Sequence, residues 1–303
     1  MKRSCKIILT ALSLLAVPAA INHYISLKFG YLNNQYERNR HTFNWRFGSV
    51  SYKKTGRGAP VLLVHGLGIG ASSYEFEAAA KVLSKYYRVY TLDLIGFGMS
   101  EKPGISYSSY LFTSLINDFV TDVIKEPCFI AASAHSADYA VMAYNLNHDN
   151  FKKMLLISPS GLKNDEPENV LLGKIVDLPL YGTFVYNILS SKLSIRYFLK
   201  KFAFYDGSMV TKSVVNKFYE AAKKDACQSR YPVSAFMCGK LNTDIRESIK
   251  RVQIPVRILW NNDAELLHSR AYKFEYSVFD RTKMLPHMEK PVSFASLCKT
   301  FFA

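Results

Sequence analysis

The chain has 303 residues, of which 49% are hydrophobic and 21% are charged, and its 39 Lys and Arg against 24 Asp and Glu give a net charge of +15. This composition excludes a disordered tail, a collagen-like fibre and a multi-pass membrane protein, and the length allows a full hydrophobic core without disulfide or metal staples. The positive charge leaves three explanations: a nucleic-acid partner, an anionic membrane surface, or a basic solvated exterior.

The N-terminal segment combines basic and apolar residues. After Lys2, Arg3 and Lys6 comes an interval of 21 residues without charge, which ends at Lys28. A membrane-spanning helix needs about 20 mostly apolar residues, and a secretory signal has a similar layout with a small-residue cleavage site. We therefore expect residues 1–28 to form an uncleaved membrane anchor, with a cleaved signal of a secreted protein, or a buried helix, as alternatives.

The charge is concentrated near this segment. Residues 1–60 carry a net charge of +9 and residues 163–251 carry +6, whereas residues 61–162 carry −2. Basic side chains after the apolar run could rest on anionic lipid headgroups. The sequence contains no nucleic-acid recognition motif, so we expect no nucleic-acid partner; which side of a membrane the domain faces, and its oligomeric state, stay open.

Strands and helices are expected to alternate from residue 45 onward. Short β-branched runs followed by segments of helical period indicate parallel strands joined by crossover helices. The expected strands are an early pair over 47–54, then 61–64, 89–94, 128–133, 154–158, 256–260 and 276–279, and the expected helices are 74–85, 110–125, 137–146 and 292–302. Together they predict an α/β core over residues 45–162 and 252–303.

Residues 163–251 interrupt this pattern. They contain helical segments, many aromatic residues and no convincing buried strand, which indicates a helical cap inserted into the core. Their aromatic side chains would either line an acyl-binding pocket or pack the cap on the sheet. The candidates for such a pocket are Tyr181, Phe184, Tyr186, Tyr197, Phe198, Phe202, Phe204 and Tyr205.

The strongest chemical signal is the segment Ala134–Asp138, between a buried strand and a helix. A serine on a tight strand–turn–helix projects its hydroxyl above the sheet, and this points to Ser136 as a nucleophile. The turn needs small residues two positions before and after the serine; Ala134 meets the first demand and Asp138 does not meet the second. The N–H of Ala137, at the start of the helix, could stabilise an oxyanion.

Two further segments follow neighbouring strands. His65–Gly68 can present a second N–H, that of Leu67, to the same oxyanion. The stretch Asp93–Pro103 contains Gly96 and Gly98, which permit a tight turn at the carboxyl edge of the sheet, where open α/β sheets place their sites.

In these motifs the sequence resembles the α/β-hydrolase superfamily. The resemblance implies a mostly parallel eight-stranded sheet with a helical cap inserted after the sixth strand. It further implies Ser136 as nucleophile, Leu67 and Ala137 as oxyanion-hole amides, and Asp263 as the acid that orients a catalytic histidine. The serine argues against the family's dehalogenases and epoxide hydrolases, which use aspartate.

The histidine departs from the family pattern. The family ends its last strand with G-H-x-x-H-x-E-x-P, and this chain has Lys283–Pro291 at that place. The alignment puts Met284 at the catalytic histidine and His287 at the second histidine. Methionine cannot accept a proton. Either His287 replaces the missing base or the triad is inactive. His135, beside Ser136, is interpreted as a packing residue.

The sequence therefore predicts a serine hydrolase that acts on a carboxylic ester or related acyl compound, lipophilic if the N-terminus is an anchor. The alternative is a catalytically impaired, membrane-tethered binding protein, which Met284 and Asp138 favour. The five cysteines are scattered and form no C-x-x-C pair, so no metal site is suggested, and no organic cofactor is expected.

Overall fold

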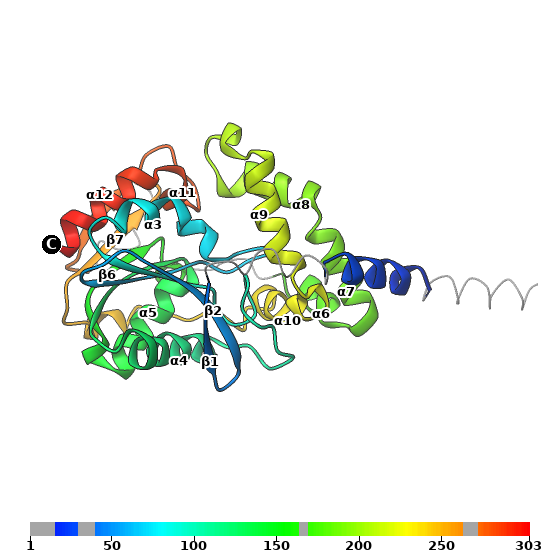
Figure 1. The fold of residues 1–303 in the computed structure, drawn as a ribbon, viewed down its shortest axis with the longest axis horizontal. Coiled ribbons are helices and arrows are strands. Elements are labelled where there is room, and N and C mark those ends of the chain that lie inside the picture. The colour runs from blue at the N-terminus through cyan, green and yellow to red at the C-terminus, as the bar shows by residue number, and fades with distance from the viewer. Residues whose placement is uncertain (1–15, 30–39, 164–168, 263–271) are drawn as a thin grey trace, which may run out of the picture.

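The structure is a computed structural model that describes residues 16–29, 40–163, 169–262 and 272–303. A twisted sheet runs through the core, helices cover both of its faces, and a separate group of helices lies at one end of the molecule (Figure 1). The strands are β1 (His41–Trp45), β2 (Gly48–Thr55), β3 (Pro60–Val64), β4 (Arg88–Leu92), β5 (Cys128–Ser133), β6 (Phe151–Ile157), β7 (Val256–Trp260) and β8 (Glu275–Val278).

The eight strands form one sheet in the order β1-β2-β4-β3-β5-β6-β7-β8. The β1–β2 and β2–β4 pairs are antiparallel, and every pair from β4 to β8 is parallel. Parallel neighbours need crossover helices, which accounts for the alternation of strands and helices along the chain. The predicted mostly parallel eight-stranded sheet is confirmed.

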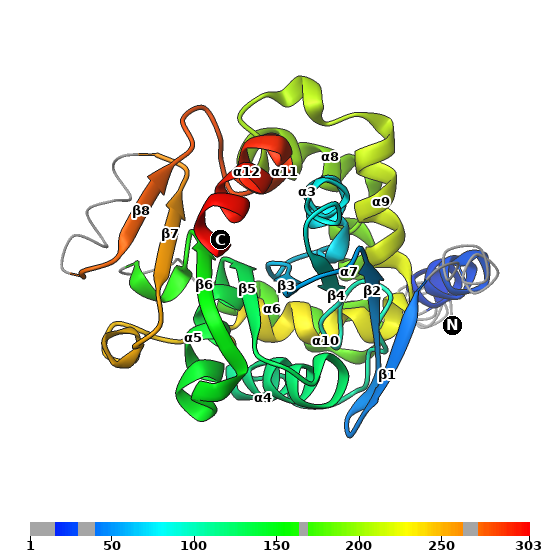
Figure 2. The same cartoon turned by 60° about the vertical axis from the view of Figure 1, so that its left-hand side comes forward.

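The core lies on both faces of this sheet, because the central strands β3 and β5 are buried along their whole length. Parallel strands covered by helices on both sides have this continuous apolar character. One face packs on α4 (Ser109–Phe119) and α5 (His135–Leu146), and the other packs on α3 (Glu77–Leu83) and α12 (Pro291–Phe302) (Figure 2). The short helix α11 (Pro286–Glu289) precedes α12.

The cap helices come between β6 and β7 in the chain. They are α6 (Val170–Asp177), α7 (Pro179–Leu189), α8 (Lys192–Phe198), α9 (Lys212–Lys223) and α10 (Ala226–Met237), and a single π-helical turn, η5 (Leu199–Ala203), continues α8. Their place after the sixth strand agrees with the predicted insertion.

Residues 16–29 form a helix that packs on the cap and extends beyond it (Figure 1). The side chain of Asn22 donates to the Leu180 carbonyl at 3.1 Å and accepts from Asn187 at 2.9 Å, and the ring of Phe29 meets Tyr219 edge-on at 5.3 Å. The first half of the expected anchor or signal, residues 1–15, lies outside the described residues. Among those described, no helix is both long enough and apolar enough to cross a bilayer.

The first strands differ from the expected pair over residues 47–54. The hairpin begins earlier, at His41, and turns at Arg46 and Phe47. Gly48 follows the turn at φ +137°, and a Cβ there would lie 2.9 Å from the carboxylate of Glu101. The turn therefore depends on glycine, whose conformational freedom alternation alone did not reveal.

Candidate functional site

The sharp turn between β5 and α5 has its apex at Ala134. This residue lies between the end of β5 and the start of α5 with φ 52° and ψ −122°, the strained backbone of a nucleophile elbow. Its side chain is half-buried, whereas the residues on both sides of it are buried. At this turn, therefore, Ala134 is the residue that a bound molecule can reach.

The residues two positions away from Ala134 support this assignment. Ala132 and Ser136 are both small and fully buried, as a turn pressed between strand and helix requires. An apex at Ser136, as predicted from the sequence, would leave Asp138 in a position that needs a small residue. The structure corrects the position of the elbow by two residues.

Ser136 lies in the first turn of α5 and is fully buried. Its hydroxyl donates to the backbone carbonyl of His65 at 2.6 Å. The N–H of Ala137 donates to the carbonyl of Ala134 at 3.0 Å, so it is already used and does not point to an oxyanion position. The geometry thus gives Ser136 and Ala137 structural hydrogen bonds in place of the predicted catalytic ones.

The loop after β3 faces this elbow. A Cβ on Gly66 would lie 3.7 Å from the Cβ of Ala134. The Gly66 N–H donates to Glu75 at 3.2 Å, and the His65 ring accepts from the Leu94 N–H at 3.0 Å, which holds the loop in place. The oxyanion role of the next amide in this loop, that of Leu67, stays a prediction.

His287 lies on α11 and is fully buried. Its ring stacks on Phe76 at 4.3 Å between centroids, and its Nε2 lies 3.6 Å from the carboxylate of Glu75. Neither ring nitrogen makes a hydrogen bond within the described part of the chain. His287 and Ser136 are therefore not joined by a hydrogen bond, which a Ser–His pair requires. Met284 is 45% exposed in the loop before α11.

The predicted acid, Asp263, lies outside the described residues. It follows the end of β7 by three residues in the sequence, and its role stays a prediction.

Two further residues near the elbow have definite partners. His135 packs as expected: its ring nitrogens lie 3.2 Å from the Ser160 hydroxyl and 3.1 Å from the Asn242 amide oxygen. Asp138 is fully buried and accepts the Gly161 N–H at 2.9 Å. It ties α5 to the segment after β6.

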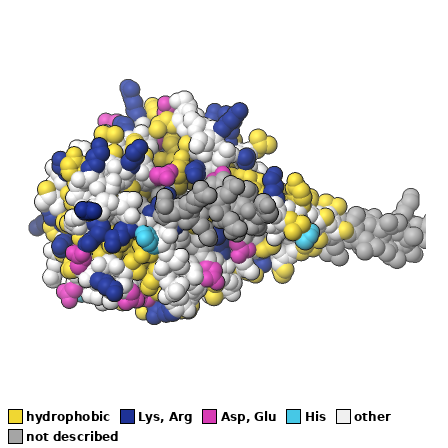
Figure 3. Space-filling model, in the orientation of Figure 1, with side chains coloured by type: hydrophobic (Ala, Val, Ile, Leu, Met, Phe, Trp, Pro, Cys, Tyr) yellow, Lys and Arg dark blue, Asp and Glu magenta, His cyan; other side chains and the backbone are white. Residues whose placement is uncertain are grey.

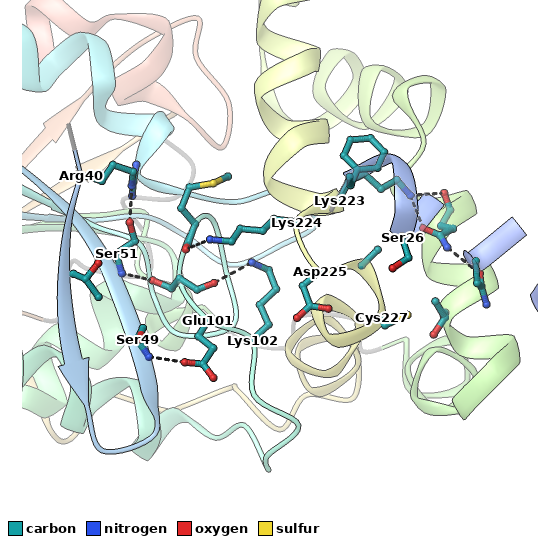
Figure 4. A pocket seen from close by; sticks show the side chains of 18 residues that line it. Ser26, Arg40, Ser49, Ser51, Glu101, Lys102, Lys223, Lys224, Asp225 and Cys227 are labelled. Carbon is teal, nitrogen blue, oxygen red and sulfur yellow. Dashed lines mark hydrogen bonds between the residues drawn. The ribbon is translucent and has the colours of Figure 1, made fainter. Parts of the chain in front are cut away.

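A cavity of about 590 Å³ lies between the core and the cap (Figure 4). Its lining combines the β2 edge, the loop after β4, the start of α10 and the helix over residues 16–29. The charged groups that line it are Arg40, Glu101, Lys102, Lys223, Lys224 and Asp225. Neither Ala134 nor Ser136 belongs to this lining, so the cavity is separate from the elbow. The described residues hold no group of three or more His, Cys, Asp or Glu side chains fit for a metal ion.

Two lysines of this cavity are almost fully buried. Lys102 donates to the carbonyls of Gly98 at 2.8 Å and Ser100 at 3.2 Å. Lys223 donates to the Asn187 side chain at 2.7 Å. Burial removes water from both ammonium groups and lowers the pKa of each to about 7.

Of the eight cap aromatic residues named from the sequence, Phe184 is half-buried and does not line the cavity, and the other seven fall into two groups. Tyr186 and Phe204 are buried and pack inside the cap. The exposed group is Tyr181, Tyr197, Phe198, Phe202 and Tyr205. None of either group lines the cavity between core and cap, so the structure does not make them its pocket wall.

The model of the alpha/beta hydrolase family matches residues 61–295. The chain therefore belongs to this family, in agreement with the sheet order, the cap insertion and the elbow. Among curated relatives, it is 23% identical over 265 residues to 2-hydroxy-6-oxo-6-(2'-aminophenyl)hexa-2,4-dienoic acid hydrolase of Metapseudomonas resinovorans, covering 83% of this chain and 87% of that protein.

Solved structures show the same fold. A meta-cleavage product hydrolase from Pseudomonas fluorescens is similar with a TM-score of 0.71 at 23% identity, over 86% of this chain and 97% of that one. A serine hydrolase involved in carbazole degradation gives 0.72 at 20% identity, over 87% and 98%. A membrane phospholipase A gives 0.68 at 18% identity, over 100% and 98%. The curated relative named above is a hydrolase, as is the family whose model matches this chain.

Proposed function

We propose that this chain uses the hydrolase fold to bind a small acyl compound, and that it does not hydrolyse this compound by the serine mechanism of the elbow. The observation that carries the proposal is Ala134 at the apex. The apex side chain is the one that attacks the substrate carbonyl in an elbow hydrolase, and a methyl group has no lone pair with which to attack. The cavity between core and cap offers space for a ligand.

The base position supports the same proposal. Met284 occupies the place of the family's catalytic histidine and cannot take a proton. His287, the nearest substitute in sequence, is stacked on Phe76 and directed at Glu75. Nucleophile and base are thus replaced together, as expected if the chemistry was lost and the fold retained.

A second candidate is the serine hydrolase in which Ser136 attacks an ester, His287 takes its proton, Asp263 orients His287, and the Leu67 amide holds the oxyanion. The hydrolase relatives favour it. It requires the Ser136 hydroxyl to leave the His65 carbonyl and become accessible, which means a rearrangement of the first turn of α5.

A fluorophosphonate probe and p-nitrophenyl acetate separate the two candidates. We expect the full chain to give no labelling or turnover above that of its Ser136→Ala variant. Labelling that disappears in Ser136→Ala and weakens in His287→Ala would contradict the binding proposal and support the serine hydrolase.

A restored elbow gives a positive test. Ala134→Ser combined with Met284→His places a nucleophile and a base at the two family positions. We expect this double variant to acquire probe labelling at residue 134, and Ala134→Ser alone to react about 10²–10⁴-fold more slowly, because a positioned base contributes that factor. Persistence of labelling after a further Ser136→Ala substitution is the control.

We also propose that the N-terminal segment associates the protein with a membrane, with secretion after signal cleavage as the alternative. The apolar and basic pattern of residues 1–28 supports this proposal. Fractionation of cells that express the full chain, with mass spectrometry of the N-terminus, distinguishes a retained anchor from a cleaved signal.

A further inference from the structure

The cap has an outer face that combines exposed apolar, aromatic and basic side chains. It is formed by α8 and η5, and we call it the α8–η5 face. Its members are Leu193, Arg196, Tyr197, Lys200, Lys201 and Phe202, all exposed. Leu193 is 82% exposed and Tyr197 is 60% exposed. Large apolar side chains gathered in this way on a surface mark a contact with another molecule or a membrane.

The basic and aromatic groups of this face are interleaved. The Lys201 ammonium donates to the Tyr197 hydroxyl at 3.0 Å and lies 5.5 Å from the centre of the Phe202 ring. Leu193, Arg196 and Lys200 join Lys201 and Tyr197 around a shallow depression of about 490 Å³. Aromatic rings with ammonium groups beside them are the composition found where protein surfaces meet the headgroup region of a bilayer.

The charge of the face has one sign. The segment 192–205 contains four basic residues and no Asp or Glu. Two copies of this face would repel each other, so a second copy of the chain is a poor binding partner for it. An anionic lipid surface, in contrast, attracts the basic face.

The helix over residues 16–29 lies at the same end of the molecule. It contacts α7 through Asn22, and α8 follows α7 directly in the chain. Tyr24 and Leu27 of this helix are 64% and 63% exposed, and hydrophobic side chains follow its length where it extends from the cap (Figure 3). The basic and apolar residues 1–15 precede it in sequence.

We infer that the α8–η5 face docks the cap on the headgroup region of an anionic bilayer. Leu193, Tyr197 and Phe202 enter the interface between headgroups and acyl chains, and the lysines remain at the phosphate level, as long basic side chains do beside apolar surfaces. This surface is additional to the N-terminal segment, and it does not depend on whether the protein hydrolyses or only binds its ligand.

The test uses the full chain and vesicles of phosphatidylcholine with 30% phosphatidylserine, with vesicles of phosphatidylcholine alone for comparison. Binding is measured by flotation over a range of lipid concentrations. Each basic residue near an anionic surface contributes about a five-fold factor, so Lys200→Ala combined with Lys201→Ala is expected to weaken binding to the anionic vesicles about 30-fold. Tyr197→Ala combined with Phe202→Ala is expected to weaken binding to both kinds of vesicle.

The matched control is Lys81→Ala combined with Lys85→Ala, which removes the same charge from exposed positions at the end of α3 in the core. We expect this control to bind as the unchanged chain does, and all variants to keep the same thermal unfolding curve. The inference is overturned if the α8–η5 variants bind anionic vesicles as tightly as the control, or if the unchanged chain does not bind them. It is also overturned if sedimentation shows that the face instead holds two copies together and the variants separate them.

Discussion

Ser136→Ala removes one hydroxyl group from the first turn of α5, and its effect separates a structural role from a catalytic one. The hydroxyl is fully buried and donates to the His65 carbonyl at 2.6 Å. This bond joins α5 to the loop after β3. If Ser136 is structural, the substitution changes the free energy of unfolding and leaves reactivity toward acyl probes at its background level.

The structure sets the size of the effect. A neutral hydrogen bond contributes about 0.5–1.5 kcal/mol net, and a buried acceptor left without its donor costs about 1–3 kcal/mol. Alanine fits the space of serine without a clash, so only these terms apply. We expect Ser136→Ala to lower the free energy of unfolding by about 1–2 kcal/mol and the melting temperature by a few degrees.

Urea unfolding followed by circular dichroism measures this difference, and the fluorophosphonate reaction of the same samples measures the catalytic role. Ser158→Ala is the matched control, because the buried hydroxyl of Ser158 makes no hydrogen bond with the described residues. We expect the control to change the free energy of unfolding by less than about 0.5 kcal/mol. The reasoning is refuted if Ser136→Ala unfolds like the unchanged protein but loses a reaction with the probe.

Three further substitutions test the buried polar groups and one tight contact. Arg40 pairs with the fully buried carboxylate of Asp93. Burial raises the pKa of this carboxyl, but the charges of Arg40 and His65 and the hydrogen bonds it accepts outweigh burial, so the pKa is lowered. The ionised carboxylate therefore stabilises the fold, and this contribution is lost as the pH falls below about 4. Arg40→Ala should cost about 3–5 kcal/mol at pH 7 and should make the loss of stability on acidification smaller, because Arg40 no longer holds the pKa of Asp93 down; urea unfolding between pH 3 and 7 would show both effects. Burial lowers the pKa of Lys102 to about 7, so between pH 7 and about 10.4 the unfolded chain binds more protons than the folded chain. The free energy of unfolding should therefore rise with pH over this interval, and it should rise less steeply in Lys102→Met. Gly161→Ala would place a Cβ 2.1 Å from the Thr243 carbonyl, and a melting curve should show destabilisation by about 3 kcal/mol.

Most of the core could be predicted because local signals agreed with the tertiary arrangement. The strands β3 and β5 are apolar throughout and fully buried, as expected for parallel strands covered on both faces. The hairpin at the sheet edge was harder, since its turn at Arg46 and Phe47 depends on the backbone freedom of Gly48. Alternation of apolar and polar residues does not report that freedom.

The elbow shows a different limit of sequence reasoning. The segment between β5 and α5 allows an apex at Ser136 or at Ala134, and the expectation of a serine nucleophile favoured the first. The pattern of small residues fits the second, because Ala132 and Ser136 flank Ala134 at the two required positions. The mismatch at Asp138 was therefore a sign that the register was wrong, and not a tolerated exception.

The contacts that hold the site could not be predicted, because they join residues far apart in sequence. Glu75 accepts the Gly66 N–H and faces His287, yet nothing in its sequence neighbourhood marks it. Asp138 accepts the N–H of Gly161, which lies 23 residues further along the chain. Such pairings depend on the sheet order, which local patterns indicate only in outline.

These contacts also explain how the elbow keeps its shape with alanine at the apex. Ser136 holds the His65 carbonyl, Glu75 holds the Gly66 N–H, and Asp138 holds the Gly161 N–H. None of the three bonds involves the side chain at the apex. The strained backbone of Ala134, which costs about 1–3 kcal/mol, is imposed by the surrounding strand and helix, so it does not depend on the side chain at the apex. The residue at the apex is therefore free to change while the elbow keeps its shape, and a family match that reports the shape does not by itself report the reaction.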